Sequence, residues 1–216
     1  MQVKINLQIF LFIIIFLLTH QIEIYACVML FAFIHELGHI IAGIILNLKP
    51  KELKLMPFGI SVIFEDYGYK KLLEIKKIII ACAGPLANIL IIITIMLLHI
   101  NIELKNTIIY SNFLIALFNL IPIYPLDGSR ILKGILRLKF SKEHADDIIN
   151  RVSNIIVVLL TAISSIIILY LKNVAILFIL MYLWIITIKE NKRYMMKKNM
   201  YKILQTDDKS SEYIDI

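Results

Sequence analysis

The sequence predicts an all-α polytopic membrane protein with about six transmembrane helices and a short membrane-associated β-hairpin. The chain of 216 residues is 60% hydrophobic and has a mean hydropathy of +0.83, far above what one soluble core requires. Its apolar residues form long runs, and its Lys and Arg residues fall mainly between those runs. The cysteines, Cys27 and Cys82, lie inside apolar runs, so we expect ordinary buried thiols and infer no oxidising compartment.

The apolar runs each approach the roughly 20 residues that cross a bilayer as a helix. They lie at about 6–20, 23–47, 72–98, 107–125, 148–171 and 173–188. With their connecting loops they form one expected membrane domain at 1–190. An alternative for residues 1–20 is a signal peptide, although the hydrophobic run resumes directly after this segment.

The basic residues indicate the orientation of the chain in the membrane. With six segments, all of the 23 Lys and Arg residues except Lys105 and Lys172 fall on one side. The positive-inside rule places that side, and with it both termini, in the cytosol. Residues 191–216 are then a short cytosolic tail with no additional domain, which we expect to rest on anionic lipid headgroups. Because the bilayer explains the basic excess, we predict no nucleic-acid partner.

A hairpin is predicted between the second and third segments. Residues 51–65 read KELKLMPFGISVIFE, with partial two-residue alternation on both sides of Pro57, Phe58 and Gly59. Its apolar side could dip into the membrane at the cytosolic face. The alternative is a loop that lies on the protein surface.

The strongest chemical signal is the sequence HELGH at 35–39, inside the second segment. Histidines four residues apart share one face of a helix, so His35 and His39 can both reach one metal ion, and the ion implied is zinc. Glu36 lies beside them, where a carboxylate acts as general acid and base without binding the metal. The alternative is a coincidental polar cluster, or two core histidines that satisfy each other.

A second polar stretch ends the fourth segment, at 119–128, and reads NLIPIYPLDG. Pro122 and Pro125 prevent a continuous helix, and a broken backbone at membrane depth survives only where protein or water satisfies it. Asp127 is therefore the leading candidate for a third metal ligand, because a cation offsets the cost of a carboxylate near an apolar segment. Alternatively, Asp127 is a turn residue or forms a surface salt bridge with Arg130.

The third segment contains AGPLAN at 83–88. Gly84 and Pro85 allow a bend and a close approach of a neighbouring helix, and Asn88 needs a hydrogen-bond partner away from water. A packing role suffices to explain this stretch.

In their order along the chain, HELGH, AGPLAN and NLIPIYPLDG resemble the motifs of the site-2 protease family of intramembrane zinc metalloproteases. The resemblance covers about residues 25–190. Within the family the chain is most similar to the bacterial sporulation branch. The resemblance implies one zinc ion per chain held by His35, His39 and Asp127, with Glu36 as the catalytic glutamate. It also implies that Asn119, Pro122 and Pro125 line the substrate path and that the loop with Phe58 dips into the membrane near the site.

The expected function is that of a zinc metalloendopeptidase that cleaves a membrane-associated protein near the cytosolic face. The resemblance implies a sporulation sigma factor precursor as substrate and inhibitory membrane proteins as partners. A broader alternative is a general site-2 protease that acts on an anti-sigma factor or a signal peptide remnant. A transporter would need polar residues spread over several segments and usually an internal repeat, and a scaffold has no use for Glu36 together with both histidines. His20, His99 and His144 lie outside the motifs, and we expect them to be dispensable.

Overall fold

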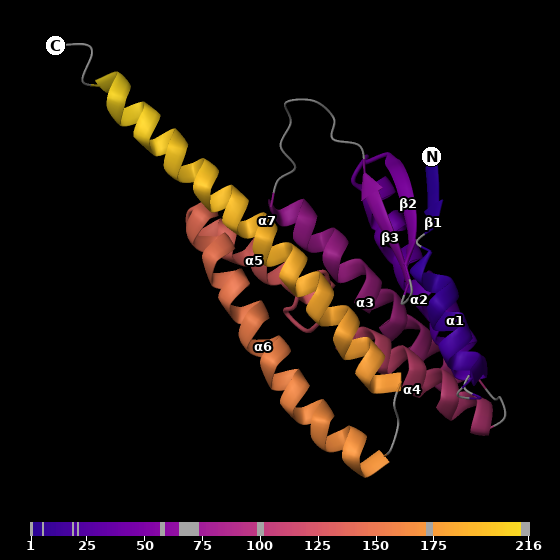
Figure 1. The fold of residues 1–216 in the computed structure, drawn as a ribbon. Helices are drawn as coiled ribbons and strands as arrows, with labels where there is room; N and C mark the ends of the chain where they lie inside the picture. The colour runs from indigo at the N-terminus through magenta and orange to yellow at the C-terminus, as the bar shows by residue number, and fades with distance from the viewer. Residues whose placement is uncertain are drawn as a thin grey trace.

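The computed structural model describes residues 2–5, 7–18, 20, 22–56, 59–64, 74–98, 102–171 and 175–212. The N-terminal part of the chain, up to β3, contains both strands and helices, and the elements after it are all helices (Figure 1). In chain order they are β1 (Gln2–Ile5), α1 (Gln8–Leu18), α2 (Ile22–Ile45), β2 (Pro50–Met56), β3 (Gly59–Phe64), α3 (Glu74–Leu97), α4 (Ile102–Asn119), α5 (Asp127–Lys139), α6 (Lys142–Leu171) and α7 (Ala175–Glu212).

A small sheet of three strands lies beside α2, in the order β1-β2-β3. β2 and β3 pair antiparallel, with Leu53 opposite Val62. β1 pairs parallel with β2, with Val3 opposite Leu53. The sequence did not predict β1, because four residues carry too short an alternating pattern to distinguish a strand from a loop. Pro57 and Phe58, between the paired strands, lie outside the described residues.

Three of the described helices are long and apolar enough to cross a membrane: α2 over Tyr25–Ile45, α3, and α6 over Lys142–Ile167. Their outer faces expose large apolar side chains, with Ile44 54%, Leu90 63% and Ile166 69% exposed. A soluble protein buries most such side chains, whereas lipid solvates them without penalty. The chain is therefore an integral membrane protein.

The other predicted segments correspond to helices that do not meet the same criterion within the described residues. α1 has 11 residues, well short of the roughly 20 that span a bilayer. α4 has 18 residues and begins with polar side chains, and α7 continues beyond its apolar half for a total of 38 residues. α7 thus includes most of the predicted tail at 191–216 as helix.

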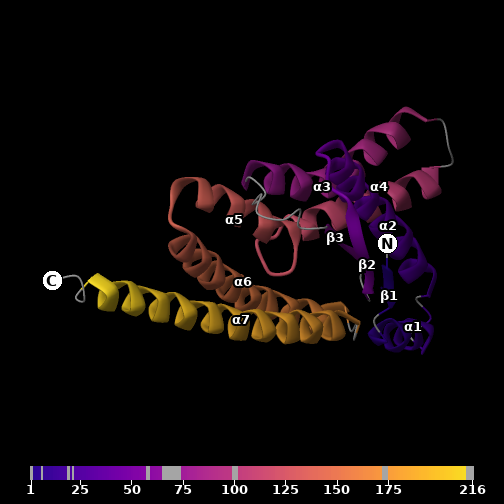
Figure 2. The same cartoon turned by 90° about the horizontal axis from the view of Figure 1, so that it is seen from above.

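The helices form two groups. α3 contacts α2, α4 and α5, while α7 pairs with α6, and α6 contacts α5. Figure 2 shows the α6–α7 pair along one side of the molecule, with the C-terminal end of α7 extending beyond the other helices. The contact between α2 and α3 is close because Gly38 has no side chain: a Cβ there would lie 2.6 Å from the Ala83 carbonyl oxygen. This close approach brings the HELGH face of α2 against α3.

Candidate metal centre

The two histidines of α2 point inward from one face of the helix. His35 and His39 are each 2% exposed, and their ring centroids lie 4.9 Å apart. This arrangement follows from their four-residue spacing, which places side chains one turn apart on the same face. Both rings are directed toward α3 and the first turn of α5.

Asp127 is the first residue of α5, and a broken stretch of backbone delivers it to the histidines. After α4 the chain turns at Leu120 and continues through a cis peptide bond between Tyr124 and Pro125. The side chain of Ile123 is 0% exposed and anchors this loop in the protein. The N-terminus of a helix favours a carboxylate, because the helix dipole is positive there. Asp127 therefore enters the site as an anion at a favourable position.

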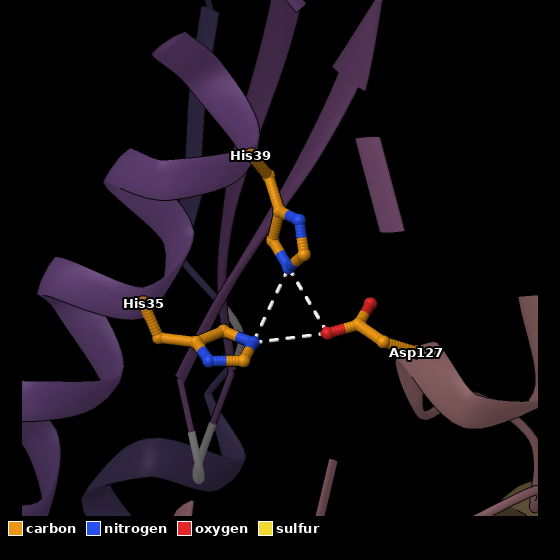
Figure 3. A group of neighbouring side chains, drawn as sticks. All are labelled: His35, His39 and Asp127. Carbon is orange, nitrogen blue, oxygen red and sulfur yellow. Dashed lines mark hydrogen bonds and ion pairs between the residues drawn. The ribbon is translucent and has the colours of Figure 1, made fainter. Parts of the chain in front are cut away.

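Three side-chain atoms from α2 and α5 meet at one point (Figure 3). Asp127 Oδ2 lies 2.9 Å from His35 Nε2 and 3.0 Å from His39 Nε2, and the two Nε2 atoms are 3.2 Å apart. A tetrahedral zinc ion with bonds of about 2.0–2.1 Å separates its ligand atoms by about 3.3 Å. The observed triangle is within a few tenths of an ångström of that requirement, so the donor set fits a metal ion of this size.

The outer nitrogens of both rings are engaged by α3. His39 Nδ1 lies 2.6 Å from the Ile80 carbonyl oxygen, and His35 Nδ1 lies 2.6 Å from Asn88 Oδ1. Because a carbonyl oxygen only accepts, His39 Nδ1 carries the proton and its Nε2 presents a lone pair to the centre of the triangle. Both Nε2 atoms lie within hydrogen-bond distance of Asp127 Oδ2, and a nitrogen that carries no proton there can act as a metal ligand.

Gly84 of α3 leaves the space that the triangle needs. A Cβ at this position would lie within 2.5 Å of His35 Nε2 and closer still to His39 Nε2. The sequence suggested only a packing role for Gly84. The structure shows that the missing side chain leaves room for both Nε2 atoms on the side of the triangle that faces α3.

Glu36 lies next to this triangle and is partly buried. Its carboxylate is close enough to interact electrostatically with His39, Asp127, His35 and Arg130. Arg130, one turn along α5, lies 3.6 Å from Asp127 Oδ1 with its Nη1 atom and is 47% exposed. Asp127 thus directs one oxygen toward the histidines and the other toward Arg130.

The remaining predicted site residues lie along the backbone that carries Asp127. Asn119 ends α4, and its side-chain amide donates to the Ile115 carbonyl at 3.0 Å. Pro122 is partly buried and Pro125 is exposed. Phe58 lies outside the described residues.

Sequence reasoning missed Asn112 of α4, which is 0% exposed and hydrogen-bonded to Asn88. The available signal was an asparagine inside an apolar run, the same signal that drew attention to Asn88.

Comparisons with known proteins agree with this geometry. Residues 101–160 match Peptidase family M50. The chain is 36% identical over 149 residues to stage IV sporulation protein FB of Bacillus subtilis (strain 168), which covers 65% of this chain and 51% of that protein. It is 34% identical over 114 residues to zinc metalloprotease MJ0392 of Methanocaldococcus jannaschii, which covers 50% of this chain and 32% of that protein. The chain spans about half the length, or less, of these curated relatives.

The fold resembles that of a site-2 protease from Methanocaldococcus jannaschii. The two structures share a TM-score of 0.65 at 21% sequence identity, over 87% of this chain and 89% of that chain. The match to Peptidase family M50 thus covers the stretch that carries Asp127, and the shared fold extends over most of the chain.

Proposed function

We propose that this protein is an intramembrane zinc metalloendopeptidase that cleaves a membrane-associated protein. The observation that carries the proposal is the meeting of His35 Nε2, His39 Nε2 and Asp127 Oδ2 on a face of α2 that also bears Glu36. The word zinc in the name of one relative supports the choice of metal. Two imidazoles and one carboxylate also match the three protein ligands of catalytic zinc sites.

The residues of the site divide the chemistry between them. His35, His39 and Asp127 would hold one zinc ion, which when bound supplies a Lewis acid that activates water and polarises a carbonyl. Glu36 accepts the proton of the attacking water and returns it to the leaving amine, because its carboxylate lies beside the ligands without being one. Arg130 balances the negative charge of Asp127 from the exposed side of the site.

A membrane helix must be locally unwound before its peptide carbonyls can be attacked, because helical hydrogen bonds shield them. Among the described strands β3 lies at the edge of the sheet, beside α2, and pairs with β2 alone. An extended substrate segment that pairs with this edge would be held next to the metal site. We assign Asn119, Pro122, Pro125 and Phe58 to the path along which this segment runs.

The proposed topology has six membrane segments within a single domain at 1–190, with both termini and the 191–216 tail in the cytosol. The distribution of basic residues supports it, because only Lys105 and Lys172 fall outside the cytosolic side. The active site then opens toward the cytosolic face. Reporter fusions at Lys105 and at the C-terminus test this topology, and a cytosolic signal at Lys105 would refute it.

The substrate we propose is the membrane-tethered precursor of a sporulation sigma factor, held in check by inhibitory membrane proteins. The 36% identity to stage IV sporulation protein FB supports this assignment. Comparison of membrane proteins between cells with the wild-type chain and cells with Glu36→Gln would identify the substrate as the precursor that accumulates in the variant.

The test of the proposed function is Glu36→Gln in the purified full-length chain. We expect the variant to keep one zinc ion per chain and to lose cleavage, since the amide cannot accept a proton but leaves the ligands in place. The matched control is His144→Ala, an exposed histidine of α6 outside the site, which should retain both zinc and cleavage. Unchanged cleavage by Glu36→Gln, or no zinc in the wild-type chain, would contradict the proposal.

A further inference from the structure

A buried chain of hydrogen bonds runs from His35 into α4. His35 Nδ1 lies 2.6 Å from Asn88 Oδ1, and Asn88 Nδ2 donates to Asn112 Oδ1 at 2.9 Å. Asn112 Nδ2 in turn donates to the Ile108 carbonyl at 2.8 Å. Both asparagines are 0% exposed. Three helices, α2, α3 and α4, are thereby joined through side-chain amides.

The far end of this chain fixes the direction of every bond in it. The Ile108 carbonyl can only accept, so Asn112 must turn its NH₂ group toward Ile108 and its oxygen toward Asn88. Asn88 must then donate to that oxygen, which turns its own oxygen toward His35. An oxygen facing His35 Nδ1 requires a proton on that nitrogen. The lone pair of His35 is thus left on Nε2, the atom that faces Asp127 and His39.

We infer that Asn88 and Asn112 are positioning residues that set the tautomer of His35 for metal binding. The inference rests on the metal site proposed above and adds two residues to it. The Ile80 carbonyl fixes the tautomer of His39 directly, because it accepts from His39 Nδ1. The acceptor at His35 Nδ1 is instead the side-chain oxygen of Asn88. The orientation of that amide depends on Asn112 and, through it, on the Ile108 carbonyl.

Packing alone does not account for these residues. An apolar side chain of similar size would fill either position without the penalty of a polar group inside an apolar helix bundle. Without Asn112, the Asn88 amide is free to rotate and present its NH₂ group to His35 Nδ1. The ring proton would then move to Nε2, where it would occupy the lone pair that binds the metal. Loss of a partner of this kind typically lowers metal affinity by roughly 10–100-fold.

The experiment compares three substitutions in the full-length chain, each stripped of metal and titrated with Zn²⁺ against a competing chelator. Asn112→Leu removes both bonds of Asn112, and we expect zinc affinity to fall by roughly 10–100-fold. Asn112→Asp keeps an acceptor toward Asn88 whether or not it is protonated, and we expect affinity within a few-fold of wild type. The matched control is Asn191→Leu, which breaks the interhelical Asn191–Asn154 bond of α7 and α6 and should leave affinity unchanged.

Nuclear magnetic resonance of ¹⁵N-histidine gives a second readout that packing would not change. The His35 signals, assigned by their loss in His35→Gln, should show a proton on Nδ1 in the wild-type chain with and without zinc. In Asn112→Leu the metal-free chain should show Nδ1 partly unprotonated. The wild-type measurement does not depend on Asn112→Leu, so misfolding of that variant does not prevent the test.

The outcomes separate the two proposals. A wild-type chain that does not bind zinc refutes the proposed function. A wild-type chain that binds zinc, with Asn112→Leu equal to Asn191→Leu in affinity, refutes the tautomer relay alone. Equal losses in Asn112→Leu and Asn112→Asp would also refute it, because they would assign the effect to the Ile108 bond or to packing.

Discussion

The helices around α3 and the α6–α7 pair both use polar side chains inside an apolar protein, but they arrange them differently. Around α3 the buried polar groups converge on one point, the triangle of His35, His39 and Asp127 with its relay of asparagines. Along α6 and α7 the polar contacts are spaced from one end of the pair to the other. They are Trp184 with Thr161, Asn191 with Asn154, and Tyr194 with Asp147.

The two arrangements differ in whether their polar atoms can also bind a metal ion together. Each of these three contacts of the α6–α7 pair joins one donor to one acceptor. Such bonds between membrane helices contribute on average about 0.6 kcal/mol each. The triangle brings three potential metal-ligand atoms to one point, where a single cation can bind all of them. Spaced polar contacts hold helices together, whereas converging ones build a site, and the substitutions below test that distinction.

The largest effect is expected from Gly84→Ala. Alanine is the better helix former by about 1 kcal/mol, so α3 itself should not be weakened. The new methyl group would lie within 2.5 Å of His35 Nε2 and would occupy the space of the metal. We expect zinc content, measured by atomic absorption after purification, to fall to background and cleavage to be lost.

Gly134→Ala is the matched control for Gly84→Ala. It also adds a methyl group at a crowded buried glycine, but the nearest atom, at 2.5 Å, belongs to Ile78 at the contact of α3 and α5. We expect some loss of stability with zinc retained. Equal loss of zinc in the two variants would mean that crowding between helices, and not occupation of the site, removes the metal.

Asp127→Asn should have the next largest effect. The substitution keeps the shape of the side chain but removes the anionic ligand. Zinc affinity should therefore fall by more than the roughly 10–100-fold that is typical when a hydrogen-bond partner of a metal ligand is lost. Cleavage should fall with it, since the site is then only partly loaded. Competition titration with Zn²⁺ measures the first and a cleavage assay the second.

Asp147→Asn, in the α6–α7 pair, is the matched control for Asp127→Asn. Asp147 is partly exposed and pairs with Arg151 at 2.8 Å and Lys198 at 3.7 Å. Exposed ion pairs of this kind contribute about 0–1 kcal/mol, and none of these partners contacts the triangle. We expect unchanged zinc affinity, and a loss as large as that in Asp127→Asn would show that the two regions are coupled.

The sequence predicted the centre of the site better than its surroundings, and the reason is geometric. His35, Glu36 and His39 lie within one helical turn, where spacing alone fixes their relative positions. Asp127 lies 88 residues from His39. It was still predicted as a ligand, because a carboxylate beside two prolines at the end of an apolar run needs a cation to offset its charge. Asn112 and the Ile80 carbonyl act through contacts between helices. No spacing in the sequence reports which face of α4 meets α3, so their roles could only come from the structure.

The fold, like the site, was predicted from the sequence only in part. Long apolar runs indicated the helices α2, α3 and α6, because their length and composition are local properties. The short strand β1 depends on pairing with β2, about 50 residues away, and its four residues carry no pattern of their own. The full length of α7 was also missed, because its charged second half resembles a solvated tail.

The smallest effect is expected from Thr161→Val in α6. The hydroxyl of Thr161 accepts a hydrogen bond from Trp184 Nε1 at 2.9 Å, and valine keeps the shape while removing the acceptor. The average interhelical bond in a membrane contributes about 0.6 kcal/mol, so unfolding in detergent should shift by about that amount. Trp184 is the single tryptophan of the chain, and its fluorescence reports the change directly. Zinc affinity should not change, because this bond is complete without any partner from the triangle. A change in zinc affinity would instead mean that the α6–α7 pair sets the position of α5, and with it the position of Asp127.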